Sequence, residues 1–94
     1  MDNLLWTDTA QESYEQTLDV IFKRWSLDVA FDWDEKVSKL LKNLNNHKNL
    51  CPPSNKYRGL RRCVITEYTS LLYRVKGDKV ELITFFDNRS ADSF

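Results

Sequence analysis

The chain has 94 residues, 14 basic and 14 acidic side chains, and a formal charge of zero. This length predicts a single domain over residues 1–94, with a core that needs no metal or disulfide to hold it. No stretch approaches the roughly 20 apolar residues of a membrane span. The first ten residues lack the basic segment and apolar run of a secretory signal. We therefore expect a cytoplasmic protein with no membrane partner and with reduced cysteines.

The charges are distributed unevenly along the chain. Residues 1–35 carry nine acidic side chains against two basic ones, and residues 36–79 carry eleven basic side chains against two acidic ones. We expect the lysines of the second helix to be solvated, whereas arginines on strands and loops can form a concave basic surface. The second half is therefore where we expect contact with an acidic partner.

The first half predicts a short strand followed by a helical hairpin. Residues 3–6 form the strand, which we place at the edge of the later sheet because two helices separate it from any partner. The helices are predicted over about Thr9–Trp25 and Leu27–Asn45, and Ser26 caps the second one. Apolar residues recur every three or four positions and predict two buried stripes. The stripes are Ala10, Tyr14, Leu18, Ile21, Phe22 and Trp25 in the first helix, and Ala30, Trp33, Val37, Leu40, Leu41 and Leu44 in the second.

The second half predicts three strands that follow an extended linker, Cys51-Pro52-Pro53-Ser54. The strands are expected at Arg62–Thr66, Leu71–Val75 and Val80–Phe86, with a bend at Thr69-Ser70 and a tight turn at Gly77-Asp78. Alternation in the last strand predicts that Val80, Leu82, Thr84 and Phe86 share one face. The element order β-α-α-β-β-β predicts an α+β fold, in which the helical hairpin packs on an antiparallel β-sheet.

The residues that commonly hold metals are few. Cys51 and Cys63 do not have metal-ligand spacing, and His47 is expected in a solvated loop after the second helix. We therefore predict no metal and no cofactor. A disulfide between the two cysteines is possible, but the expected compartment favours free thiols.

Positive charge is densest just before the sheet. The segment Lys56-Tyr57-Arg58-Gly59-Leu60-Arg61-Arg62 holds four cations in seven residues. Guanidinium groups match phosphate oxygens in a bidentate way, and Tyr57 could stack on a base. This pattern favours contact with nucleic acid or an acidic protein. The alternative is an ordinary exposed strand whose cations are neutralised by acids of the first helix.

Further polar residues are expected on the face of the sheet that the helices leave open. Strand alternation places Arg62 and Arg74 on that face, and Asp87-Asn88-Arg89 at its rim. The predicted target- or nucleic-acid-binding residues are Lys56, Tyr57, Arg58, Arg62, Arg74, Asn88 and Arg89.

The sequence contains no arrangement of nucleophile, base and orienting group, and no glycine-rich phosphate loop. A metal-independent endoribonuclease needs a general base, a general acid and cations that stabilise the developing phosphorane charge. The candidate catalytic residues are the cations Lys56, Arg58, Arg61, Arg62 and Arg89. A convincing general acid or base for neutral pH is missing from this set.

Three segments resemble the RelE/ParE superfamily of bacterial toxins: IFKRWS at the helical turn, LRRCVI in the first sheet strand, and SLLYRVKGDKVELITFFDNR. The resemblance spans nearly the whole chain. It implies the toxin of a type II toxin–antitoxin module, a plasmid stabilisation protein that a cognate antitoxin neutralises in a hetero-oligomer. RelE-like members cut mRNA on the ribosome, whereas ParE-like members act on DNA gyrase.

The match to the ribonuclease branch is incomplete. Lys56 and Arg58 match its basic residues before the second strand, and Arg89 falls near its C-terminal arginine. Ser70 stands where RelE-like chains often carry Arg, and Phe94 where they often carry Tyr. The resemblance therefore favours a ParE-like toxin that inhibits growth through gyrase. The alternatives are a RelE-like ribonuclease and an inactive relative that acts only as an interaction domain. From the residues, the antitoxin is expected on the helical hairpin groove and a free strand edge.

Overall fold

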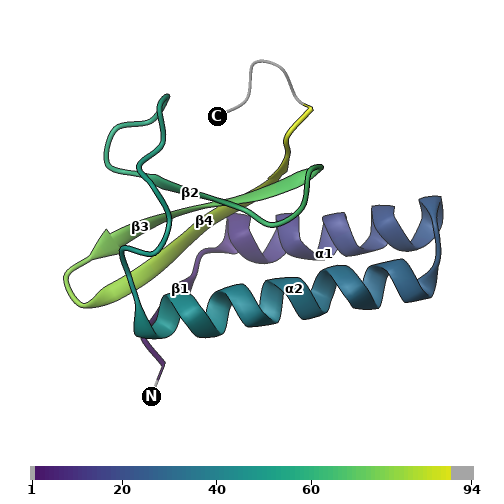
Figure 1. Cartoon of the computed structure of the whole chain (residues 1–94), viewed down its shortest axis with the longest axis horizontal. Helices are drawn as coiled ribbons and strands as arrows, with labels where there is room; N and C mark the ends of the chain where they lie inside the picture. The colour runs from purple at the N-terminus through teal and green to yellow at the C-terminus, as the bar shows by residue number, and fades with distance from the viewer. Residues whose placement is uncertain (1, 90–94) are drawn as a thin grey trace.

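A computed structural model describes residues 2–89, which form two layers: a four-stranded sheet and a helical hairpin that covers one of its faces (Figure 1). The predicted α+β order is confirmed. The elements are β1 (Leu4–Trp6), α1 (Asp8–Arg24), α2 (Leu27–Asn46), β2 (Arg61–Val64), β3 (Thr69–Lys76) and β4 (Lys79–Asp87).

The strands lie in the order β1-β4-β3-β2. The last three form the predicted antiparallel meander, and Gly77 has the expected positive φ of 64° in the turn between β3 and β4. The first strand lies at the edge, as predicted, and pairs in parallel with β4, so that Leu4 is opposite Val80. The sheet is therefore mixed, and its first strand depends on its last.

Both helices begin at a hydroxyl cap. The Thr7 side chain accepts from the amide of Ala10 at 3.0 Å and donates to the carbonyl of Leu82 at 2.7 Å, which ties the start of α1 to the sheet. The Ser26 side chain accepts from the amide of Val29 at 3.2 Å. Because only two residues separate the helices, they run side by side as a tight antiparallel hairpin.

The core lies between the hairpin and the sheet. The α2 stripe is confirmed: Ala30, Trp33, Val37 and Leu44 are buried. In α1 the prediction is wrong at Phe22 and Trp25, whose side chains are 51% and 52% exposed. The reason is visible in Figure 1, where the connected end of the hairpin extends past the end of the sheet.

A β-bulge reverses the predicted faces of β4. Leu72 pairs with Thr84 but the next residue, Tyr73, pairs with Leu82, so Ile83 is an extra residue on β4. The buried residues on the helix side are consequently Val80, Leu82 and Phe85, and Phe86 turns to the open face. The prediction that Thr84 and Phe86 share a face with Val80 and Leu82 is therefore wrong.

Two further expectations are wrong in the second half. Thr69 and Ser70 open β3 rather than forming a bend, and the turn before it is Thr66–Tyr68. Cys51 and Cys63 form a disulfide, with Cα atoms 5.3 Å apart, where free thiols were expected. The linker brings them together because it folds back along β2, where the amide of Arg62 donates to the carbonyl of Pro52 at 3.0 Å.

Within residues 2–89, no helix is long and apolar enough to cross a membrane.

Candidate functional site

Arg62 is held on the open face of the sheet, as predicted. Its Nη2 donates to Oδ1 of Asn88 at 2.9 Å, and its Nε donates to Oγ of Ser70 at 3.3 Å. Its guanidinium carbon lies 5.3 Å from the ring centre of Phe86. Because a guanidinium has five N–H donors, these contacts fix the group and leave donors for an anion.

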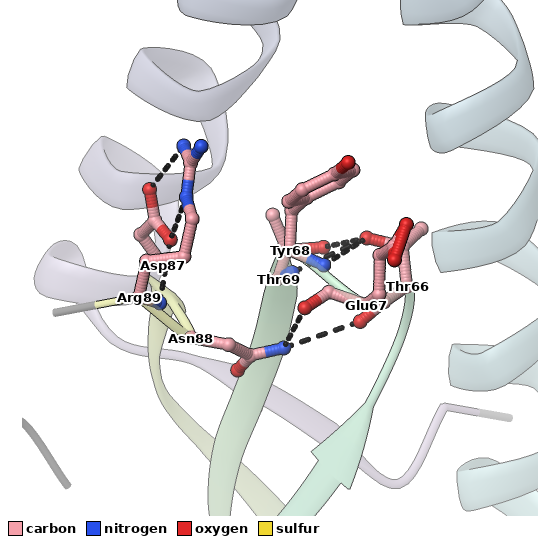
Figure 2. A network of polar contacts seen from close by, with 7 residues as sticks. All are labelled: Thr66, Glu67, Tyr68, Thr69, Asp87, Asn88 and Arg89. Carbon is pink, nitrogen blue, oxygen red and sulfur yellow. Dashed lines mark hydrogen bonds and ion pairs between the residues drawn. The ribbon is translucent and has the colours of Figure 1, made fainter. Parts of the chain in front are cut away.

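Asn88 is the centre of this network. Its Oδ1 accepts from Arg62 and also from the hydroxyl of Ser70 at 2.5 Å. Its Nδ2 donates to the carbonyls of Thr66 and Glu67 at 3.2 and 3.1 Å (Figure 2). Its backbone amide completes the set by donating to the carbonyl of Tyr68 at 2.8 Å. Asn88, which was predicted at the rim, therefore links the end of β4 to the start of β3 and to the Arg62 side chain of β2.

The Arg89 side chain points away from Asn88 (Figure 2) and contacts Asp87 and Tyr68 instead. Its Nη2 and Nε contact the carboxylate of Asp87 at 2.9 and 3.1 Å, and its guanidinium carbon lies 5.1 Å from the ring centre of Tyr68. The hydrogen bonds from Arg89 hold the pKa of Asp87 below its usual range. Arg89 is thus an exposed cation that is already paired.

Arg89 lines a groove of about 890 Å³ between the two helices, the Thr66–Tyr68 turn and the end of β4. Its lining is largely apolar, with Val20, Trp25 and Val29 from the hairpin. Trp25 and Tyr68 approach each other across it, with ring centres 6.1 Å apart. A groove of this size and polarity suits an apolar segment of a partner.

The remaining predicted residues lie outside the network of Arg62 and Asn88. Lys56, Tyr57 and Arg58 are exposed in the loop before β2, which projects from the sheet on the side away from the helices (Figure 1). Arg61 donates to the carbonyl of Cys51 at 2.6 Å and so supports the linker. Arg74 lies on the open face, as predicted, because its neighbours Tyr73 and Val75 face the helices, and it forms an ion pair with Glu81. The structure therefore divides the predicted set into a loop, the open face of the sheet and a groove.

The sequence predictions missed Trp25 and Tyr68 as groove residues. Trp25 fitted the periodicity of a buried stripe, and Tyr68 lies in a segment that was not expected to turn toward the helices. A signal was available for Trp25, because it lies in the two-residue connection between the helices, at the end of the hairpin that is least covered by the sheet.

Among residues 2–89, the groups whose pKa is shifted do not form a proton-transfer pair. Burial, followed by the hydrogen bond to and charge of Asp34, raises the pKa of Tyr14 to about 12. Burial also raises the pKa of Tyr73. These shifts and that of Asp87 all move away from neutrality. In the described part of the chain, no group of three or more His, Cys, Asp or Glu residues could hold a metal ion.

A sequence model described as the ParE toxin of the type II toxin–antitoxin system parDE matches residues 4–92. The chain belongs to the ParE toxin family. None of the curated protein sequences matches it significantly.

Solved structures of related toxins share the ParE fold described above. A chain of the chromosomal ParDE system from P. aeruginosa has a TM-score of 0.78 and 19% identity, with 93% of this chain and 96% of that chain covered. The YoeB/ParE toxin from Agrobacterium tumefaciens has a TM-score of 0.67 and 22% identity, with 94% and 99% covered. A chain of the E. coli DinJ-YafQ toxin–antitoxin complex has a TM-score of 0.65 and 12% identity, with 96% of each covered. At these identities the likeness establishes the fold and does not separate one toxin target from another.

Proposed function

We propose that this ParE-family toxin inhibits growth by acting on DNA gyrase, and that its fixed arginine, Arg62, contacts the target. The supporting observation is the composition of the Arg62 site. Ser70 and Asn88 both use their polar groups to hold the guanidinium. The site therefore presents a positioned cation beside neutral groups that are already bonded, an arrangement that suits binding better than proton transfer.

The test is a supercoiling assay with purified gyrase and toxin, followed by primer extension of mRNA after induction in cells. We expect inhibition of supercoiling, and no discrete cuts in mRNA. Arg62→Ala should raise the half-inhibitory concentration about tenfold, as expected for a charge-assisted contact. Lys39→Ala, at an exposed position on α2, is the matched control and should not change it.

The second candidate is a ribosome-dependent, metal-independent endoribonuclease. It is favoured by the exposed loop that carries Lys56, Tyr57 and Arg58, because cations beside an aromatic ring suit single-stranded RNA. Discrete in-frame cuts after induction, lost in Lys56→Ala/Arg58→Ala, would replace gyrase with mRNA as the target. A chain that binds its antitoxin tightly, yet affects neither gyrase, mRNA nor growth, would instead be an inactive relative.

We also propose that a cognate antitoxin binds this chain in a hetero-oligomer by seating an apolar segment in the groove. The apolar side chains Val20, Trp25 and Val29 support this, because each is at least 42% exposed and lines the groove. Trp25→Ala should weaken antitoxin binding about tenfold or more, as truncation of an aromatic anchor does. Phe31→Ala is the matched control, since Phe31 is 63% exposed but lies outside the groove lining. If both changes weaken antitoxin binding equally, the groove is not the antitoxin-binding site.

A further inference from the structure

We propose that Asn88 is a positioning residue on which both candidate surfaces depend. It holds Arg62 on the open face and fastens the Thr66–Tyr68 turn beside the groove. Its consequence for activity rests on the proposed function, whereas its effect on the turn does not. This role replaces direct target contact, which the sequence predicted for Asn88.

The first argument is that its hydrogen-bonding capacity is already used. An asparagine side chain offers two N–H donors and an oxygen with two acceptor sites. Both donors go to backbone carbonyls, and both acceptor sites are taken by Arg62 and Ser70. A target group could bind Asn88 only by displacing a partner, whereas the adjacent guanidinium still has unused N–H donors.

The second argument concerns the turn that Asn88 fastens. Ile65 and Thr69 close it, because the amide of Ile65 donates to the carbonyl of Thr69 at 3.0 Å and the amide of Thr69 donates to Oγ1 of Thr66 at 3.2 Å. Tyr68 sits between these residues, and its carbonyl accepts the backbone amide of Asn88. Asn88, directly after β4, thus holds the turn with three hydrogen bonds, to the carbonyls of Thr66, Glu67 and Tyr68.

The groove wall follows from the turn. Tyr68 contacts the guanidinium of Arg89 on one side and the ring of Trp25 across the groove. If the turn moved, the Tyr68 ring would lose its contacts with Arg89 and Trp25. Asn88 therefore shapes the groove without being among the residues that line it.

The third argument concerns Arg62, whose guanidinium is oriented by Asn88 together with a fully buried Ser70. Long side chains such as arginine lose much rotamer freedom when they bind, and a side chain that is already oriented loses less. Asn88 should accordingly strengthen every contact that Arg62 makes with a target, without touching the target.

The first experiment separates the two arms of Asn88 by amide hydrogen exchange. Asn88→Asp keeps an oxygen for Arg62 and Ser70, but it replaces the donor that faces the carbonyls of Thr66 and Glu67 with a second acceptor. We expect the amides of Ile65 and Thr69 to exchange about tenfold faster, because two hydrogen bonds to the turn are lost. The amides of Leu71 and Leu82 should be unchanged. Asn49→Asp, at an exposed turn after α2, is the matched control.

The second experiment tests whether Asn88 acts through Arg62. Asn88→Ala and Arg62→Ala should each raise the half-inhibitory concentration of the toxin against gyrase about tenfold. The double variant should be no weaker than either single variant, because the two changes remove the same interaction. Asn88→Ala should also weaken binding of the antitoxin several-fold, whereas Arg62→Ala should not.

Three outcomes would overturn the proposal: turn amides that exchange in Asn88→Asp as they do in Asn49→Asp, acceleration of all core amides alike, or additive loss in the double variant. If the wild-type protein leaves gyrase active while the turn amides respond as expected, the gyrase proposal fails and the positioning of the turn by Asn88 stands. The two failures are therefore distinguishable.

Discussion

The two ends of the helical hairpin have similar sequence patterns and different environments. At the base, where α1 begins and α2 ends, Ala10 and Leu44 are fully buried against the sheet. At the tip, where the helices are connected, Phe22, Leu27 and Phe31 are each more than half exposed. Both ends carry apolar residues at helical spacing, so the pattern alone does not distinguish them.

The difference arises because the sheet is shorter than the hairpin (Figure 1). At the base, apolar side chains stabilise the fold, since their burial removes surface from water. At the tip, similar side chains remain exposed to water, where they add little to stability and lower the solubility of the protein. The base therefore contributes most of the stability that the hairpin provides and the tip contributes little, and each prediction below tests that division.

The largest effect is expected from a matched pair of leucines. Leu44→Ala at the base should reduce the free energy of unfolding by about 3 kcal/mol, because it leaves a cavity in a packed core. Leu27→Ala at the tip should reduce it by less than about 0.5 kcal/mol. Urea unfolding of both variants measures this. Equal losses would mean that the tip is as well packed as the base.

The disulfide should contribute nearly as much to the base. It closes a loop between residues 12 positions apart, and the loss of a constraint on so short a loop costs roughly 3 kcal/mol. Reductant should therefore lower the urea midpoint of the wild-type protein. The Cys51→Ala/Cys63→Ala variant is the control, and its midpoint should not respond to reductant. A wild-type midpoint that is equally indifferent would show that the thiols are free.

A smaller effect on stability is expected midway along the hairpin, at the hydrogen bond from the Tyr14 hydroxyl to Asp34. The pKa of Tyr14 is raised to about 12, above its ordinary value near 10, so the folded state holds the proton more tightly. The associated stability is fully present below pH 10 and is lost as the pH rises toward 12. Solvent screening limits it to about 1 kcal/mol.

Urea unfolding at pH 8 and pH 11 tests this. Tyr14→Phe should be about 1 kcal/mol less stable than the wild-type protein at pH 8, and the gap should narrow at pH 11. Tyr68→Phe, at a tyrosine that is 42% exposed, is the control for general effects of losing a phenol. A gap that widens with pH would reverse the assigned direction of the Tyr14 pKa.

The smallest effect on stability is expected at the groove. Arg89→Ala removes the group that holds down the pKa of Asp87, so that pKa should rise toward its ordinary value in a carboxylate titration followed by NMR. Because both side chains are largely exposed, the free energy of unfolding should hardly change. A large loss of stability would show that Arg89 stabilises the fold as much as the buried residues of the base do.

The base of the molecule was predictable because periodicity and burial coincide there. The α2 stripe, the edge position of the first strand and the Gly77 turn all follow from local patterns that the rest of the chain reinforces. The tip was mispredicted at Phe22 and Trp25 because periodicity cannot report where the sheet ends.

The errors in the second half have a common cause in pairing over distance. The extra residue at Ile83 is set by the register against β3, and an alternating sequence gives no sign of it. The disulfide depends on the linker folding back on β2.

For the candidate site, the sequence predicted which residue types are present, but not how most of them are arranged in space. The cations could be read from the sequence, and Arg62 was correctly placed on the open face. That Arg89 would turn to the opposite side of Asn88 depends on the contacts of Asp87 and Tyr68, which are tertiary.

The parallel pairing of β1 with β4 also determines when the sheet can form during synthesis of the chain. Leu4 cannot pair until Val80, which is 76 residues later in the chain (80 − 4), has been synthesised. At about 5–20 residues per second, translation separates these two residues by roughly 4–15 s. The anchor of α1 on Leu82 is delayed equally. A nascent chain therefore cannot complete its sheet until β4 has been synthesised, and a partner that recognises the complete fold has nothing to bind before that point.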